Sequence, residues 1–270
     1  MKEFSGGSSK ITCIPNGVHV PRQAPANPGR GPLRLIYVGA MDHYYKGTLH
    51  LKGIADWLRT MGIQFTLDLV GGGKDYGQLR TVMADHERGG NVRFHGALPP
   101  KEATTLLAAS DALLMPSYHE GLPIVLLEAM ARGVVPICSR IVGSTDYVIH
   151  GPEEGFLIEP GDEKGYADAA ARLTDRARLA RMSRATWKAA FERHSAQRMT
   201  DGYLSLIESN LRVRGAGPPG KSGAVLKSAL GDLPTLPKFA VRPARRLLRA
   251  LGMMAKPVPG PLFPKEQGEG

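Results

Sequence analysis

Short apolar runs alternate with amphipathic stretches along the first two hundred residues of the chain. Five runs rich in aliphatic and β-branched residues are expected to form strands: 33–38, 65–70, 91–94, 112–115 and 134–137. Helical patterns occupy five other segments: 46–61, a polar stretch between the glycines at 71–73 and the strand at 91–94, the stretch that opens at Pro99 and Pro100, 123–131, and 165–210. Because strands and helices alternate and several strands end at glycine, the pattern predicts an α/β fold with a Rossmann-like, doubly wound parallel sheet.

The charge of the chain is concentrated near its C-terminus. The 270 residues carry a formal net charge of +10, and residues 211–270 account for +8 of it, through eleven Lys or Arg and three acidic residues. The same segment holds 9 of the 21 prolines and 9 of the 33 glycines. These shifts predict a disordered leader over 1–10, a folded body over 11–210 and a basic, Pro/Gly-rich tail over 211–270.

Composition excludes several classes of protein. No apolar run approaches the ~18 residues of a membrane-spanning helix, and residues 1–10 contain no hydrophobic signal core. Cys13 and Cys138 are too few for a disulfide scaffold and are expected to be buried, reduced thiols of a cytoplasmic protein. The lack of zinc-finger spacing and of aromatic–basic interleaving argues against a nucleic-acid partner.

One candidate for phosphate chemistry follows the first predicted strand. Gly39 opens a loop that leads to Lys46 and Gly47 at the start of a predicted helix. A flexible backbone, a helix N-terminus and a point charge together suit a phosphate, although a solvated surface lysine is the alternative. The glycines at 71–73 fit neither the G-x-G-x-x-G fingerprint nor a P-loop, and we interpret them as tight strand-to-helix packing.

Two glutamates eight positions apart follow the predicted strand at 112–115. Glu120 lies in the loop after that strand, whereas Glu128 lies in a helix whose other residues are almost all apolar. A carboxylate in such surroundings is costly to bury unless it accepts hydrogen bonds, and ribose hydroxyls are suitable donors. A glutamate on a solvent-facing stripe is the alternative, but this helix shows no polar stripe, so the pattern favours a binding role.

Eight short motifs occur in one order along the body: Ile14-Pro-Asn-Gly-Val18, Tyr37-Val-Gly39, Lys46-Gly47, Val70-Gly-Gly, Val92-x-Phe94-x-Gly96, Pro116-Ser117, Glu120-x7-Glu128 and the segment around Gly143. With these motifs the body resembles the C-terminal, nucleotide-sugar-binding domain of the family 4 retaining glycosyltransferases, which have the GT-B fold. The resemblance implies transfer of a hexose from a nucleotide-diphosphate sugar to a glycan or lipid-linked acceptor, with no metal ion and no cofactor. The lack of an Asp-x-Asp pair also disfavours the metal-dependent GT-A class.

The same resemblance implies roles for individual residues. Lys46 would bind the donor diphosphate beside Gly39, and Glu120 would contact the transferred sugar at the reaction centre. The remaining donor contacts would be the backbone N–H groups of Gly121 and Leu122, the ribose-binding carboxylate of Glu128, and the base-binding loop at Gly96 and Ala97. His43, His95 and His119 flank these loops without metal-ligand spacing, and we interpret them as solvated or structural histidines.

Two features depart from the family pattern. Ala40 stands where the family commonly has an arginine, so one cation for the diphosphate is missing. The family's N-terminal acceptor-binding domain is not found ahead of residue 11, and we expect either a truncated product or a separate polypeptide that supplies it. A non-catalytic nucleotide-sugar-binding module, or one subunit of a split glycosyltransferase, is the alternative to an enzyme. A Rossmann-type dehydrogenase is third, because the dinucleotide fingerprint is absent.

The basic tail contains a predicted amphipathic helix near 242–256. Five basic residues share one side of it at helical spacing: Arg242, Arg245, Arg246, Arg249 and Lys256. Leu and Met residues fall on the other side, and such a helix can lie on an anionic membrane surface, each basic residue contributing about 1 kcal/mol. A peripheral membrane location is therefore expected, with packing against its own domain, or disorder, as the alternative.

Overall fold

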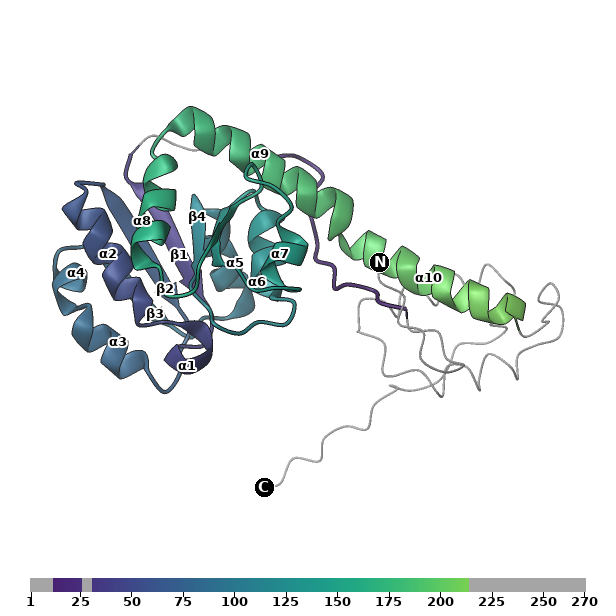
Figure 1. The fold of residues 1–270 in the computed structure, drawn as a ribbon, viewed down its shortest axis with the longest axis horizontal. Helices are drawn as coiled ribbons and strands as arrows, with labels where there is room; N and C mark the ends of the chain where they lie inside the picture. The colour runs from purple at the N-terminus through teal and green to yellow at the C-terminus, as the bar shows by residue number, and fades with distance from the viewer. Residues whose placement is uncertain (1–11, 26–30, 214–270) are drawn as a thin grey trace, which may run out of the picture. The chain divides into compact units, whose positions relative to one another are not determined.

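A six-stranded parallel sheet forms the centre of the compact unit Pro15–Met199 (Figure 1). The computed structural model describes residues 12–25 and 31–213, and Pro15–Met199 make one unit that contains the whole sheet. In chain order the strands are β1 (Leu33–Val38), β2 (Phe65–Val70), β3 (Val92–Gly96), β4 (Ala112–Met115), β5 (Val135–Ser139) and β6 (Phe156–Ile158). They lie in the order β3-β2-β1-β4-β5-β6. The order reverses between β1 and β4, and open α/β sheets bind ligands at such a switch point.

Helices connect the strands and continue beyond the last one. In chain order they are α1 (His43–Lys46), α2 (His50–Thr60), α3 (Tyr76–Val82), α4 (Ala84–Arg88), α5 (Pro100–Ala108), α6 (Ile124–Met130), α7 (Thr145–Val148), α8 (Glu163–Arg172), α9 (Arg176–Arg193) and α10 (Ala196–Val213). Within residues 12–25 and 31–213, no helix is both long and apolar enough to cross a bilayer.

The sheet buries side chains on both of its faces. On one face, Leu35 and Tyr37 of β1 belong to a core cluster with Ile54 of α2 and Tyr166 of α8. On the other face, Ile36 of β1 packs in a cluster with residues of β4, α5 and α6: Leu113, Leu107 and Ala129. Because successive strand residues point to opposite faces, burial of both faces requires the nearly continuous apolar runs from which these strands were predicted.

The strand predictions agree closely with the structure. The predicted strands at 33–38, 65–70 and 112–115 are confirmed to the residue as β1, β2 and β4. Those at 91–94 and 134–137 begin and end one or two residues later than predicted, as β3 and β5. The short elements β6 and α7 were not predicted, because three or four residues give no usable periodicity.

The helix predicted over 46–61 is wrong at its N-terminal end. Lys46 is the last residue of α1, Gly47 follows in the left-handed conformation with φ of 59°, and α2 begins at His50. A left-handed residue cannot continue a right-handed helix, so the two helices are separate. Lys46 therefore lies at the C-terminal end of a helix, not at the helix start that the sequence predicted.

The helical stretch predicted over 165–210 consists of α8, α9 and α10. Asp175 separates α8 from α9, because its carboxylate caps α9 by accepting hydrogen bonds from the N–H groups of Ala177 and Arg178. The predicted leader over 1–10 and the predicted membrane helix at 242–256 lie outside the described residues, and the structure describes the segment 211–270 only as far as Val213.

The two cysteines differ in burial. Cys138, in β5, is buried as predicted, but Cys13 is exposed, so the expectation of two buried thiols is wrong for Cys13. Residues 12–17 form no strand or helix, and Val18, which follows them, forms an isolated bridge with Ser195. Local apolar sequence does not bury a residue that belongs to no packed element.

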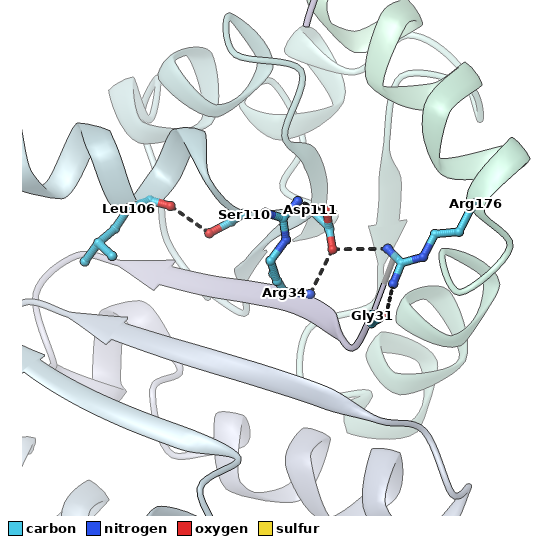
Figure 2. A network of polar contacts seen from close by, with 6 residues as sticks. All are labelled: Gly31, Arg34, Leu106, Ser110, Asp111 and Arg176. Carbon is cyan, nitrogen blue, oxygen red and sulfur yellow. Dashed lines mark hydrogen bonds and ion pairs between the residues drawn. The ribbon is translucent and has the colours of Figure 1, made fainter. Parts of the chain in front are cut away.

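Charged side chains connect β1, β4 and α9 at the amino-terminal end of the sheet (Figure 2). The Asp111 carboxylate, whose side chain is 2% exposed, accepts hydrogen bonds from the backbone N–H of Arg34 at 2.9 Å and from its guanidinium at 2.6 Å. Arg176 donates to the same carboxylate at 3.3 Å and to the carbonyl oxygen of Gly31. Asp111 directly precedes β4, so this cluster stabilises the sheet edge opposite to the strand ends that carry the candidate site.

Candidate functional site

A cavity opens at the carboxyl-terminal edge of the sheet, between the loops that follow β1 and β4. Its volume is about 390 Å³, and it is lined by Ala40, Asp42, Tyr45, Lys46, His119, Glu120 and Gly121. The first four residues come from the segment between β1 and α2, which contains α1, and the last three come from the loop after β4. The cavity therefore lies at the switch point of the strand order.

The short helix α1 forms the first wall of the cavity. The Asp42 carboxylate caps α1 by accepting a hydrogen bond from the N–H of Tyr45 at 3.3 Å, and Gly47 ends the helix. A Cβ atom on Gly47 would lie 1.9 Å from the carbonyl oxygen of Pro116, so glycine is required where the two loops meet. The N–H of Tyr118 donates to the carbonyl of Tyr45 at 2.9 Å. Backbone contacts thus fix one wall against the other.

Lys46 and Glu120 form an ion pair within this cavity. The Lys46 Nζ lies 2.8 Å from Oε1 and 2.9 Å from Oε2 of Glu120, and the Ser117 hydroxyl donates to Oε1 at 2.7 Å. The Glu120 side chain is 8% exposed and that of Lys46 is 30% exposed. The carboxylate is therefore satisfied by protein groups, whereas part of the ammonium, which has three N–H donors, remains accessible from the cavity.

Two ionisable groups beside Glu120 are held in their neutral forms. Burial, followed by the charges of Glu120 and Asp42, raises the pKa of the Tyr37 phenol well above its usual value, and its hydroxyl donates to the carbonyl of Ala40 at 2.7 Å. Burial, followed by the charge of Glu120, likewise raises the pKa of the Cys138 thiol. A thiol kept protonated is a poor nucleophile, so neither group is suited to covalent or base catalysis here.

Asp42 is the second carboxylate of the cavity, and it is held ionised. Burial acts to raise its pKa, but the hydrogen bond from the N–H of Tyr45 and the Lys74 ammonium, 3.3 Å away, lower the pKa below its usual value. An anionic ligand near this carboxylate needs a cation as a partner, and Lys46 supplies one directly at the cavity wall.

Comparison with known proteins assigns the domain to a family. Residues 23–189 match the family model described as glycosyl transferases group 1. The chain belongs to the group 1 glycosyltransferases. The parallel six-stranded sheet with helices on both faces agrees with this family, and the predicted fold class is confirmed.

Relatives of this glycosyltransferase domain are longer than the part they share with it. Glycogen synthase from Mycobacterium tuberculosis (strain CDC 1551 / Oshkosh) is 34% identical over 174 residues, which are 64% of this chain and 42% of that protein. The UDP-Gal:alpha-D-GlcNAc-diphosphoundecaprenol alpha-1,3-galactosyltransferase of Escherichia coli is 28% identical over 192 residues, 65% of this chain and 48% of that protein. The chain thus spans less than half the length of these relatives.

Solved structures share the fold at lower sequence identity. The pneumococcal O-GlcNAc transferase GtfA, in complex with UDP and GlcNAc, superimposes with a TM-score of 0.62 at 19% identity. The match covers 74% of this chain and 40% of that one. This likeness extends over most of the described residues and concerns the fold alone.

Three of the site residues predicted from the sequence of this glycosyltransferase domain line the cavity: Lys46, Glu120 and Gly121. The other five are not among the lining residues: Gly39, Gly96, Ala97, Leu122 and Glu128. Gly39 follows β1 and Gly96 ends β3, and Gly71, which follows the intervening strand β2, contacts both. The Gly71 N–H donates to the Gly96 carbonyl at 2.7 Å. A Cβ on Gly71 would lie 1.9 Å from the Gly39 carbonyl oxygen, as expected for tightly packed glycines.

Glu128 is half-buried on a partly open edge of α6. It lies one turn after Ile124, which is 43% exposed, while Leu126 and Leu127 are fully buried. Among the described residues the Glu128 carboxylate has no hydrogen-bond partner, whereas its backbone carbonyl accepts a hydrogen bond from the Arg132 guanidinium at 2.8 Å. The helix therefore has no polar stripe, as its sequence indicates, but it has an exposed edge that contains an apolar residue, Ile124.

Two residues of the cavity were not singled out from the sequence, Asp42 and Tyr45, and His119 was interpreted only as solvated or structural. An aspartate three residues before Tyr45, followed by glycine at position 47, is the signal of a short capped helix and could have located α1. His119 is exposed and lines the cavity. Within the described ranges, no group of three or more His, Cys, Asp or Glu side chains is arranged to hold a metal ion.

Proposed function

We propose that this domain binds the nucleotide-diphosphate sugar of a hexosyltransferase, and that the chemistry is retaining and independent of metal ions, as the family resemblance implies. The Lys46–Glu120 pair carries the proposal, because side chains from the two loops at the switch point meet in one cavity of about 390 Å³. A lysine suits the phosphates, and a carboxylate suits the hydroxyl groups of a sugar. A sugar diphosphate presents both kinds of group, phosphates and hydroxyls.

In this proposal Lys46 neutralises the diphosphate, whose negative charge grows as the bond between sugar and phosphate breaks. Lys46 lies at the C-terminal end of α1, where the helix dipole is negative, so the ammonium alone provides the positive charge. Glu120 contacts the transferred sugar. Because the ion pair already orders the Lys46 side chain, donor binding costs less side-chain entropy than it would with a free lysine.

Six further residues complete the proposed donor site: Gly39, Gly96, Ala97, Gly121, Leu122 and Glu128. Gly96 and Gly121 have open space where a Cβ atom would stand, which leaves room for a ligand against the backbone. Leu122 and Gly121 precede the Pro123 cap of α6, so their N–H groups lie outside the helix and are proposed to bond to sugar or phosphate. The carboxylate of Glu128 is proposed to accept hydrogen bonds from the ribose.

The acceptor is proposed to be a glycan or a lipid-linked glycan. The names of two relatives contain glycogen and a diphosphoundecaprenol-linked GlcNAc, both of which carry sugars. Since the shared part is 42% and 48% of those proteins, we propose that a further domain, on the same or a separate polypeptide, binds the acceptor.

A cytoplasmic location on an anionic membrane surface is proposed for the protein, supported by the charge of +8 in residues 211–270. Co-sedimentation of the full chain with vesicles containing anionic lipid should exceed that with neutral vesicles. Replacing Arg245, Arg246 and Arg249 together by glutamate should abolish the difference. Equal pelleting of the two proteins with anionic vesicles would contradict the proposal.

A non-catalytic nucleotide-sugar-binding module is the second candidate, and Ala40 favours it. Ala40 lines the cavity but offers no cation, so the diphosphate has one fewer positive partner than in the family pattern. The two candidates differ in turnover rather than in binding.

Calorimetric titration of the full chain with UDP-, GDP- and ADP-sugars tests the proposal. Glu128→Ala is expected to weaken donor binding about tenfold, the worth of one or two hydrogen bonds to ribose. Glu87→Ala, on α4, is the matched control and should leave the affinity unchanged. Binding with donor hydrolysis or sugar transfer supports an enzyme, and binding without either supports the module. A wild-type protein that binds none of the three donors refutes both.

A further inference from the structure

Three residues from three elements form a hydrogen-bonded chain behind the loop that carries Glu120. The Glu163 carboxylate oxygen Oε1 lies 2.8 Å from His50 Nδ1, and His50 Nε2 lies 2.5 Å from the Tyr118 hydroxyl. Glu163 is the first residue of α8, His50 is the first residue of α2, and Tyr118 stands two positions before Glu120. These two hydrogen bonds thus connect the first residues of α8 and α2 to the loop of the candidate site.

Each contact in this hydrogen-bonded series pairs a donor with an acceptor. The Glu163 carboxylate oxygen accepts a hydrogen bond from His50 Nδ1–H. A hydroxyl both donates and accepts, so the Tyr118 hydroxyl pairs with His50 Nε2 in either form of the imidazole. Glu163 therefore fixes the orientation of His50, and His50 fixes the position of the Tyr118 side chain.

Helix α2 is shaped to admit the carboxylate of Glu163. A Cβ atom on Gly53 would lie 1.7 Å from Oε2 and 2.8 Å from Oε1 of Glu163. Glycine inside a helix costs about 1 kcal/mol relative to alanine, so helix stability does not explain this residue. The contact with Glu163 does explain it, because any side chain at position 53 would displace the carboxylate.

Helix α8 also holds the end of the strand that precedes the loop. The Tyr166 hydroxyl donates to the carbonyl of Met115 at 2.9 Å and lies 3.0 Å from the Ser139 hydroxyl. Met115 is the last residue of β4 and stands three positions before Tyr118. Since these bonds hold the end of β4, the hydrogen bonds through His50 are left to position the loop that follows it.

We propose that Glu163 and His50 are positioning residues of the donor site, which hold Tyr118 so that the loop over 117–121 presents Glu120 to Lys46. Neither Glu163 nor His50 lines the cavity, so both act through Tyr118. The part of this inference that concerns donor affinity rests on the proposed function, whereas the part that concerns loop order does not.

Amide hydrogen exchange of the loop tests the positioning role without a donor. The N–H groups of Tyr118 and His119 bond to the Tyr45 carbonyl at 2.9 and 3.2 Å, so their exchange reports whether the loop is in place. Tyr118→Phe and Glu163→Ala are each expected to accelerate this exchange about 3- to 10-fold, the net worth of one hydrogen bond, with exchange in β1 and β2 unchanged. Unchanged loop exchange, or equal acceleration in the strands, would overturn the inference.

Gly53→Ala is the sharper variant, because its methyl group displaces Glu163 while alanine favours the helix. It should accelerate loop exchange and weaken UDP binding about 3- to 10-fold in the wild-type background. In a Glu163→Ala background, Gly53→Ala should change neither the loop exchange nor the affinity for UDP. Gly77→Ala in α3 is the matched control, since no atom lies within 4 Å of the added Cβ. Equal effects of Gly53→Ala in both backgrounds would contradict the coupling.

The outcomes separate the positioning role from donor binding. If the wild-type protein binds no UDP but loop exchange responds to Tyr118→Phe and Gly53→Ala as expected, the donor hypothesis fails and the positioning of the loop stands. If UDP binds and neither affinity nor exchange responds to these variants, the positioning role fails.

Discussion

At the residue scale, the charges around the cavity are compensated in pairs. Lys46 and the Ser117 hydroxyl satisfy Glu120, and Lys74 together with the backbone of α1 satisfies Asp42. A buried carboxylate without such partners would be protonated or would destabilise the fold. The pairing explains how two carboxylates can line a site that is proposed to accept an anion.

His194, at the end of α9, makes the stability of the domain depend on pH. Its side chain is 3% exposed, and neither ring nitrogen has a hydrogen-bond partner among the described residues. Burial, followed by the charges of Arg193 and His150, lowers its pKa from 6.5 to about 4. As the pH falls from about 6.5 to about 4, the unfolded chain binds a proton that the folded protein excludes, so the free energy of unfolding falls by about 3 kcal/mol in total.

Urea unfolding measured at several pH values between about 7.5 and about 4.5 checks this expectation. His194→Leu should remove most of the loss of stability at low pH, because leucine cannot be protonated. His19→Gln replaces an exposed histidine and should leave the loss in place. The same pH dependence in the wild type and in His194→Leu would show that another group is responsible.

At the element scale, the contact between α1 and the loop after β4 depends on Gly47. Gly47→Ala adds left-handed strain of about 1 kcal/mol and places a Cβ atom 1.9 Å from the Pro116 carbonyl oxygen. We expect a loss of about 3 kcal/mol in the free energy of unfolding, since backbone must move to relieve the contact.

Gly62→Ala is a matched control for Gly47→Ala. Gly62 also has a positive φ, of 70°, but no atom lies within 4 Å of its added Cβ, so only the strain of about 1 kcal/mol is expected. Denaturant unfolding of both variants measures the difference. Equal losses would mean that the close approach of the two loops is not maintained by Gly47.

The elements differ in how far the sequence predicted them. β1, β2 and β4 were predicted to the residue because strands buried on both faces are largely apolar runs, here bounded by glycine, proline or polar residues. The start of α2 was not, because the spacing of apolar residues from 46 onward is helical whether or not Gly47 interrupts it. Gly47 ends α1 as a left-handed capping residue, a feature that the periodicity of apolar residues does not contain.

At the scale of the whole molecule, stability and chemistry lie at opposite edges of the sheet. Asp111, Arg34 and Arg176 join β1, β4 and α9 at the amino-terminal edge, and Lys46 meets Glu120 at the carboxyl-terminal edge. Neither edge accounts for the net charge of the protein, because +8 of the +10 belongs to residues 211–270. The isoelectric point therefore says little about the donor.

Contacts between distant parts of the sequence were beyond sequence analysis. Motifs placed Lys46 and Glu120 in one predicted site, but the chain from Glu163 through His50 to Tyr118 has no local pattern, since its members are 113 and 68 residues apart. The same is true of Asp111 and Arg176, which are 65 residues apart. Such pairs become neighbours only through the order of the strands.

The central claim is that Lys46, held by Glu120, binds the diphosphate of the donor, and the most direct test is calorimetric titration with UDP of the wild type, Lys46→Ala and Lys188→Ala. Lys188 is the matched control, because its ammonium pairs with Glu192 on α9, away from the cavity lining, and its side chain is 68% exposed. We predict that Lys46→Ala weakens UDP binding at least about tenfold, as expected for a charge-assisted hydrogen bond, while Lys188→Ala changes it less than about twofold. Equal affinities of the wild type and a folded Lys46→Ala protein would contradict the claim.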